Sequence, residues 1–154
     1  MRSKIAFCDQ TERISVGAFS AMLERRRLMQ LVFEASDSVD WAQTMGNSTM
    51  VPAPVLRSVI LYCFALNICA SEEIIEASET EAGVNYLRAN FEFEWSTIHE
   101  FRRHGYSAIR DALTNLFVTI FLDAGQTPSV FAARCEAEAR LRRAIQADSI
   151  VLDL

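Results

Sequence analysis

Apolar residues recur at steps of three and four along most of this chain, which is the spacing of one face of an α-helix. The pattern is clearest between residues 106 and 123, where the apolar stripe consists of Ile109, Leu113, Leu116, Phe117, Ile120 and Phe121. A broader stripe covers residues 16–35 and is interrupted by the charged run 24–27. That segment is therefore predicted either as one helix with an exposed turn or as two helices joined by a kink.

Two further segments define the expected core. Residues 54–69 are apolar on nearly all sides, which predicts a buried central helix, and Pro54 suits its first turn. Gly125 is placed as a stop signal, and Thr127-Pro128 reads as an N-cap and a first-turn proline. The helix predicted to follow, over 128–147, has an apolar stripe of Val130, Ala133, Ala137, Leu141 and Ala144/Ile145. Its expected outer face carries Glu136, Glu138, Arg140, Arg142 and Arg143.

Three hydroxyl side chains stand where short helices are expected to begin. Ser71 precedes Glu72 and Glu73, and acidic residues are favoured in the first turn of a helix. Ser78 and Thr97 each stand three residues before a glutamate, which is the spacing of a capping box. The short helices predicted from these signals cover about 71–77, 79–89 and 97–104, with a loop over 90–94.

These elements predict an all-α fold, a compact bundle of six or seven helices with a helix-turn-helix-like segment. Five glycines and three prolines leave few turns for an all-β sandwich. The 154 residues, of which 51% are hydrophobic, suffice for one core. We expect a helical domain over residues 1–126 and a C-terminal helix and tail over 127–154.

Composition narrows the classes of function. A formal net charge of −5 excludes a generally basic nucleic-acid binder and leaves room only for a local basic patch. The longest apolar run, Val59 to Ala70, is too short to cross a bilayer. The first residues lack the pattern of a secretory signal peptide, so we expect a cytoplasmic protein without a membrane partner.

Reactive residues are few and scattered. The four cysteines, Cys8, Cys63, Cys69 and Cys135, form no C-x-x-C pair, and His99 and His104 are the only histidines. We therefore predict no metal site and interpret the cysteines as reduced thiols that pack as small apolar groups. The chain has no P-loop, nucleophile elbow or H-E-x-x-H motif. We predict that it is not an enzyme, binds no cofactor and has no small-molecule substrate.

The charges are distributed unevenly. Residues 72–94 hold seven glutamates against the single Arg88, a net charge of −6. Such a run is either a solvated helix face or an acidic docking surface for a basic partner. Residues 99–110 hold three arginines against Glu100, a net charge of +2.

Several short patterns resemble a known family. They are Pro54-Val-Leu with Leu61-Tyr62, Ser71 to Ala77, Tyr86-Leu87, Ser96-Thr97-Ile98-His-Glu-Phe101-Arg102-Arg103-His104, Leu116-Phe117 and Ala124-Gly125. Over roughly residues 5–126 the chain resembles the N-terminal, InsH-type domain of insertion-sequence DDE transposases. Ser-Thr-Ile-x-x-Phe-Arg is the most specific of these patterns.

The resemblance implies a helical domain that helps to recognise or bring together transposon ends. It also implies a chain without transposase activity, because the family's catalytic carboxylates lie in a downstream ribonuclease-H-like domain. The chain departs from the family at Glu72 and Glu73, where arginines are common, and at Glu94-Trp95, where Pro-Asp is common. Both departures make this face more acidic or more apolar.

Two hypotheses for the function follow. The first, taken as the nominal role, is association with duplex DNA through a recognition-like helix that opens at Ser96-Thr97. Its expected contacts are Ser96, Thr97, Arg102, Arg103 and His104, with Arg57 and Arg110 as flanking phosphate contacts. The alternative is a non-enzymatic protein-interaction or self-association module that has lost DNA binding. In that case residues 128–147 either form a homo-oligomer contact or cover the chain's own core, and the arginines of 25–27 meet the acidic segment of a second copy.

Overall fold

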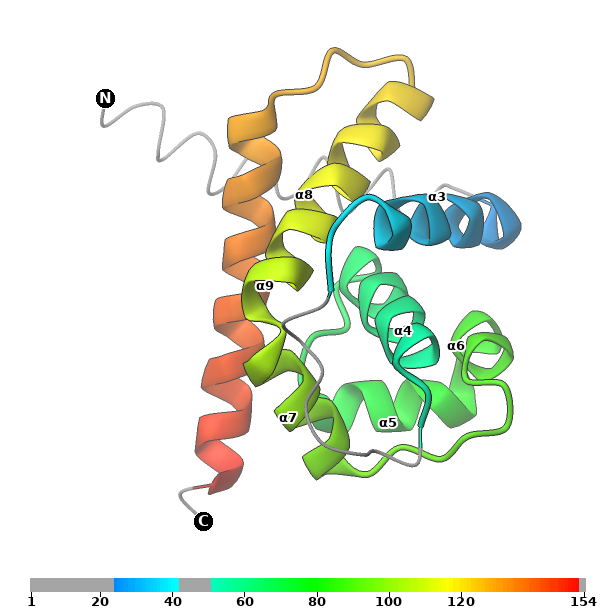
Figure 1. The fold of residues 1–154 in the computed structure, drawn as a ribbon, viewed down its shortest axis with the longest axis vertical. Coiled ribbons are helices and arrows are strands. Elements are labelled where there is room, and N and C mark those ends of the chain that lie inside the picture. Colours follow the sequence, from blue (N-terminus) through cyan, green and yellow to red (C-terminus); the bar gives the residue numbers. More distant parts are fainter. Residues whose placement is uncertain (1–23, 42–50, 153–154) are drawn as a thin grey trace.

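The computed structural model of this protein describes residues 24–41 and 51–152, and every regular element within those ranges is an α-helix (Figure 1). In chain order they are α3 (Arg25–Asp37), α4 (Ala53–Ala65), α5 (Ser71–Thr80), α6 (Ala82–Leu87), α7 (Trp95–His104), α8 (Tyr106–Asp123) and α9 (Val130–Leu152). The all-α prediction is therefore confirmed for the described residues, and the seven helices agree with the six or seven expected. None of these helices is long and apolar enough to cross a membrane.

Helix α4 is the centre of the core, as its apolar sequence predicts. Nine of its residues are buried, and α3, α6 and α8 pack against it. Pro54 lies in the first turn, as expected. The helix ends at Ala65 rather than near residue 69, because Asn67 adopts a left-handed conformation with φ 66°. The amides of Asn67 and Ile68 then donate to the carbonyls of Phe64 and Cys63, which is the pattern of a Schellman motif.

Helices α8 and α9 form an antiparallel pair along one side of the molecule (Figure 1). The whole predicted apolar stripe of α8 is buried, with Ile109, Leu113, Leu116, Phe117 and Ile120 fully inaccessible. Gly125 ends this helix with φ 76°, which confirms the predicted stop signal. On α9 the small side chains of Ala133, Ala137 and Ala144 are buried with Leu141. The stripe predicted over 128–147 therefore covers the chain's own core, apart from Val130 and Ile145, which are exposed.

Three of the predicted helix starts are wrong by a few residues. Helix α6 begins at Ala82 because the Glu81 carboxylate accepts a hydrogen bond from the Val84 amide at 2.8 Å. Ser78 instead lies inside α5, and its hydroxyl donates to the Ile75 carbonyl at 2.6 Å. The segment predicted as one helix over 79–89 is therefore the end of α5 followed by the short α6.

The other two displaced starts belong to α7 and α9. Helix α7 begins at Trp95, so Thr97 is already inside its first turn. Helix α9 begins at Val130, where the hydroxyl of Ser129 accepts from the Ala132 amide at 3.2 Å. Pro128 therefore precedes the helix, and α9 also continues to Leu152, beyond the predicted end at 147.

The charged run 24–27 marks a helix start. Helix α3 begins at Arg25, and Glu24 before it is extended, with ψ 139°. Of the two alternatives for residues 16–35, the one with a continuous helix through this run is therefore wrong. Residues 16–23 lie outside the described part of the chain.

Candidate functional site

Helix α7 carries most of the residues predicted to contact DNA. Three residues of its Ser-Thr-Ile-x-x-Phe-Arg pattern, however, point into the protein. Ile98, Phe101 and Arg102 are buried. The Arg102 guanidinium donates to the Cys69 carbonyl at 3.3 Å and is paired with the Asp148 carboxylate. Burial lowers the pKa of Arg102 to about 10, which leaves the group charged at neutral pH. Arg102 was predicted as a DNA contact, but its donors are used inside the protein.

Asp148 of α9 is the acceptor at the centre of this buried cluster, with only 1% of its surface exposed. Besides the Arg102 guanidinium, it accepts the Ser71 amide at 3.2 Å and the Ser71 hydroxyl at 2.6 Å. Nδ1 of His99 lies 3.1 Å from the same carboxylate. Because these groups come from α5, α7 and α9, one side chain fastens three helices together. Ser71 was predicted as an N-cap, but its hydroxyl serves this cluster instead.

His99 is the part of the cluster nearest to solvent. Its ring stacks on Trp95, with centroids 4.6 Å apart and planes 13° apart. Burial, and after it the Arg102 charge, lowers the pKa of His99, since Arg102 already neutralises the Asp148 carboxylate beside it. The Ser71 hydroxyl bonds to Asp148 and not to a ring nitrogen. The arrangement therefore differs from a serine nucleophile paired with a histidine base.

The remaining residues of the predicted DNA contact are not gathered into one cationic surface. Ser96 and Arg103 are exposed and Thr97 is partly buried, whereas the exposed His104 ring lies 3.1 Å from the Glu100 carboxylate. Arg57 stacks over the Trp41 ring at 5.1 Å, and Arg110 pairs with Asp111 at 3.2 Å. Among the described residues, Arg103 is the arginine of this set that is exposed without a partner.

A second buried charge pair was predicted to lie on the outer face of α9. Arg140 donates to Glu136 at 2.8 Å, and both side chains are buried. The Arg140 guanidinium also donates to the carbonyls of Phe64 and Ala65 and lies 4.8 Å from the Phe117 ring. A cation at the last carbonyls of α4 is favoured by the helix dipole. Arg140 therefore fixes α9 to the end of the central helix and is not available to a partner.

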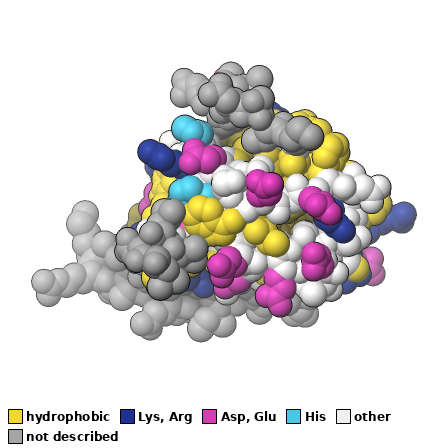
Figure 2. Space-filling view, turned by 90° about the horizontal axis from the view of Figure 1, so that it is seen from below, with side chains coloured by type: hydrophobic (Ala, Val, Ile, Leu, Met, Phe, Trp, Pro, Cys, Tyr) yellow, Lys and Arg dark blue, Asp and Glu magenta, His cyan; other side chains and the backbone are white. Residues whose placement is uncertain are grey.

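The glutamates of the acidic segment, residues 72–94, are dispersed over the surface. Figure 2 shows carboxylates distributed over the face seen from below, with apolar and neutral surface between them. The exposed glutamates of this segment are Glu72, Glu73, Glu76, Glu79, Glu92 and Glu94. Such spacing is the expected form of a solvated face.

The cysteines of the described chain are free thiols. Cys63 and Cys69 are buried and Cys135 is partly buried, while Cys8 lies outside the described residues. Burial raises the pKa of Cys69 to about 11 and that of Cys63 well above its usual range. Both buried thiols are therefore protonated at neutral pH and pack as small apolar groups.

A groove that the sequence did not predict runs between α3 and α6 and reaches α4. It consists of two open cavities of about 520 and 490 Å³, and Phe33 and Tyr86 line both. Tyr86 is 72% exposed and Phe33 45% exposed. The other apolar lining residues are Met29, Pro54, Val55, Ala82, Leu87 and Ala89.

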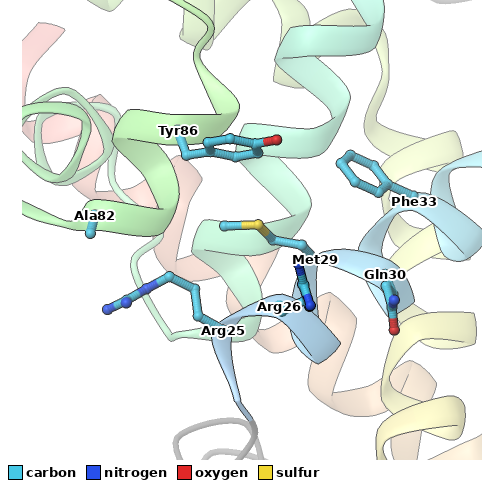
Figure 3. A pocket seen from close by; sticks show the side chains of 7 residues that line it. All are labelled: Arg25, Arg26, Met29, Gln30, Phe33, Ala82 and Tyr86. Atoms are coloured by element: carbon cyan, nitrogen blue, oxygen red, sulfur yellow. The ribbon is translucent and has the colours of Figure 1, made fainter.

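The walls of this groove come from distant parts of the chain. Figure 3 shows the Tyr86 ring reaching from α6 toward Met29 and Phe33 of α3. Gly83 permits α6 to lie this close to α4, because a Cβ at that position would collide with the Tyr62 hydroxyl. Arg25, Arg26 and Gln30 provide the polar part of the lining at the start of α3.

Comparison with known proteins provides no further assignment. No family model matches the chain, and neither a curated protein nor a solved structure matches it significantly. The site must therefore be interpreted from its own geometry.

Proposed function

We propose that this chain is a non-enzymatic protein-interaction domain whose partner docks as a helix in the groove between α3 and α6. The observation that carries the proposal is the exposed pair Phe33 and Tyr86, which lines both of the open, mainly apolar cavities of the groove. Apolar surface that is gathered in a groove, and not scattered singly, is typical of an interaction site. An open groove between two helices suits the apolar face of a third helix.

The chemistry of the lining supports a macromolecular partner. Met29 lines the same cavity as the two aromatic side chains, and methionine adapts its shape to different apolar partners. Tyr86 and Phe33 offer large contact areas with few rotatable bonds, which suits residues that anchor an interface. Both cavities are wide open to solvent, which fits a docked helix better than an enclosed small ligand.

The other two hypotheses receive less support. Duplex DNA would meet a helix whose most specific arginine, Arg102, is buried against Asp148. Self-association through residues 128–147 would require an apolar stripe that already packs against α8. Docking in the groove requires neither the release of a buried arginine nor the separation of packed helices, because the apolar side chains of the groove are already exposed.

Selection from a displayed library of helical peptides tests this proposal. Peptides recovered on the full-length protein are expected to carry apolar residues at helical spacing and to bind the Tyr86→Asp variant at least tenfold more weakly. The matched control is Ile150→Asp, which replaces a similarly exposed apolar residue, 65% against 72%, on the distant α9. Peptides that bind Tyr86→Asp as tightly as the unmodified protein would overturn the proposal.

Titration with duplex DNA at about 50 and 200 mM salt tests the alternative of DNA association, since phosphate contacts weaken strongly over that range. We expect no salt-sensitive binding. Binding that disappears with Arg103→Ala would favour DNA association instead.

A further inference from the structure

The groove has charge at one end only. Its lining includes Arg25 and Arg26 and no acidic side chain. Both arginines belong to the first turn of α3, which contains no acidic residue and has no side-chain cap. Glu24 precedes this turn and Glu81 pairs with Arg25, so Arg26 is the cation at this end of the groove that has no carboxylate partner among the described residues.

The three arginines at the start of α3 are not equivalent. Arg27 points to α8, where it pairs with Asp123 at 2.7 Å. Arg25 pairs with Glu81 at 3.3 Å through its Nε and remains half exposed. Arg26 is exposed and has no partner among the described residues. Arg26, the cation that is free to meet a ligand, thus lines the groove.

The direction of α3 also favours a negatively charged ligand group at this end of the groove. The N-terminus of a helix carries a partial positive charge, so three cations in the first turn are unfavourable for the isolated helix. A carboxylate placed over Arg26 would relieve that repulsion while it pairs with the guanidinium. The glutamates elsewhere on the surface oppose this only weakly, because physiological salt screens charges over about 8 Å.

We infer that the groove recognises an amphipathic helix that carries acidic residues at the end lying over Arg25 and Arg26. This inference rests on the proposed function and adds the charge and the orientation of the partner. The apolar face of the partner would contact Met29, Phe33 and Tyr86, and its acidic turn would lie at the start of α3. The C-terminal turn of the partner fits this end best, because its dipole is negative there.

Synthetic peptides test the inference directly. A groove-dependent peptide from the selection is prepared in three versions that differ only in the C-terminal turn, which carries two Glu, two Gln or two Lys. Exposed charge pairs are weak, so the Glu peptide should bind roughly three- to tenfold more tightly than the Lys peptide at low salt. The difference should shrink at high salt.

Charge reversal in the protein supplies the decisive comparison. Arg26→Glu is expected to invert the order so that the Lys peptide binds more tightly. Arg103→Glu is the matched control, since it reverses an exposed, unpaired arginine on α7 and should leave the order unchanged. Equal binding of the three peptides, or an order that Arg26→Glu leaves unaltered, would overturn the inference while the groove remains the docking site. Loss of the dependence on Tyr86 would instead overturn the proposed function.

Discussion

At the scale of single residues, the protein is organised by two buried cations. Arg102 is balanced by Asp148, and Arg140 by Glu136 and by main-chain carbonyls. A charge without water must be paired and hydrogen-bonded, or it becomes costly. Asp148 accepts from the Arg102 guanidinium and from the Ser71 amide and hydroxyl, and Nδ1 of His99 lies beside it, so its carboxylate is well satisfied. We therefore expect the largest loss of stability when one member of a pair is replaced and the other is left buried.

Replacement of Arg102 by leucine tests this expectation. The variant leaves Asp148 buried without its cation, and loss of one partner of a buried pair typically costs about 3–5 kcal/mol. Urea unfolding should show a lower free energy of unfolding by that amount. Arg103→Leu, on the exposed side of the same helix, should change it by less than about 0.5 kcal/mol. Equal losses in the two variants would contradict the buried role of Arg102.

His99 predicts how stability depends on pH. Its pKa is lowered in the folded protein, so the unfolded chain binds a proton more readily near its usual value of about 6.5. His99 therefore adds to the free energy of unfolding above that pH. This contribution is lost as the pH falls through that value, and it does not change further below the pKa of the folded state. Urea midpoints measured between about pH 8 and 5.5 should fall less in His99→Gln than in the unmodified protein.

The second histidine provides the control for this experiment. His104 is exposed next to Glu100, outside the buried cluster. His104→Gln therefore controls for the loss of a histidine outside that cluster. A pH dependence that His99→Gln leaves unchanged would show that another group is responsible.

At the scale of elements, α9 decides how the other helices are joined. Its buried alanines allow close packing on α8, Arg140 reaches the end of α4, and Asp148 reaches α5 and α7. The expected boundary at residues 126 and 127 falls in the connection between α8 and α9. Nevertheless α9 shares the core with the helices before it, so it is part of the same folded unit.

Truncation after Gly125 tests the role of α9. Removal of the helix would expose the apolar face of α8 and leave Arg102 without Asp148. We expect loss of the cooperative thermal transition in circular dichroism, together with aggregation. A chain that ends at Ile150 retains Asp148 and should unfold cooperatively. A folded monomer after truncation at Gly125 would show that α9 is dispensable for the core.

At the scale of the whole molecule, the arrangement of charge matters more than the net value. The exposed glutamates are spread over the surface seen in Figure 2, whereas the groove end carries Arg25 and Arg26. The segment 99–110 presents less positive charge at the surface than its sequence suggests, because Arg102 is internal and Arg110 pairs with its neighbour Asp111. The groove is a surface where apolar and cationic groups occur together.

The helices were largely predictable because their signal is local. The stripe of α8 and the turn at Gly125 depend on residues within a few positions of one another, and both are confirmed. Helix starts were less predictable, because several nearby groups compete for the first amides. Glu81 and Ser129 form hydrogen bonds there, whereas Ser78 bonds inside α5 and Ser71 turns to Asp148.

The sequence by itself thus determined an all-α fold, the central position of α4 and an uneven distribution of charge. Only the tertiary structure decided which charges are internal, because the pairs join residues far apart: Arg102 meets Asp148 across 46 positions, and Arg140 meets Phe64 across 76. The groove was equally hidden, since Phe33 and Tyr86 belong to different helices. Periodicity identifies the apolar face of a helix, but only packing determines whether another face covers it.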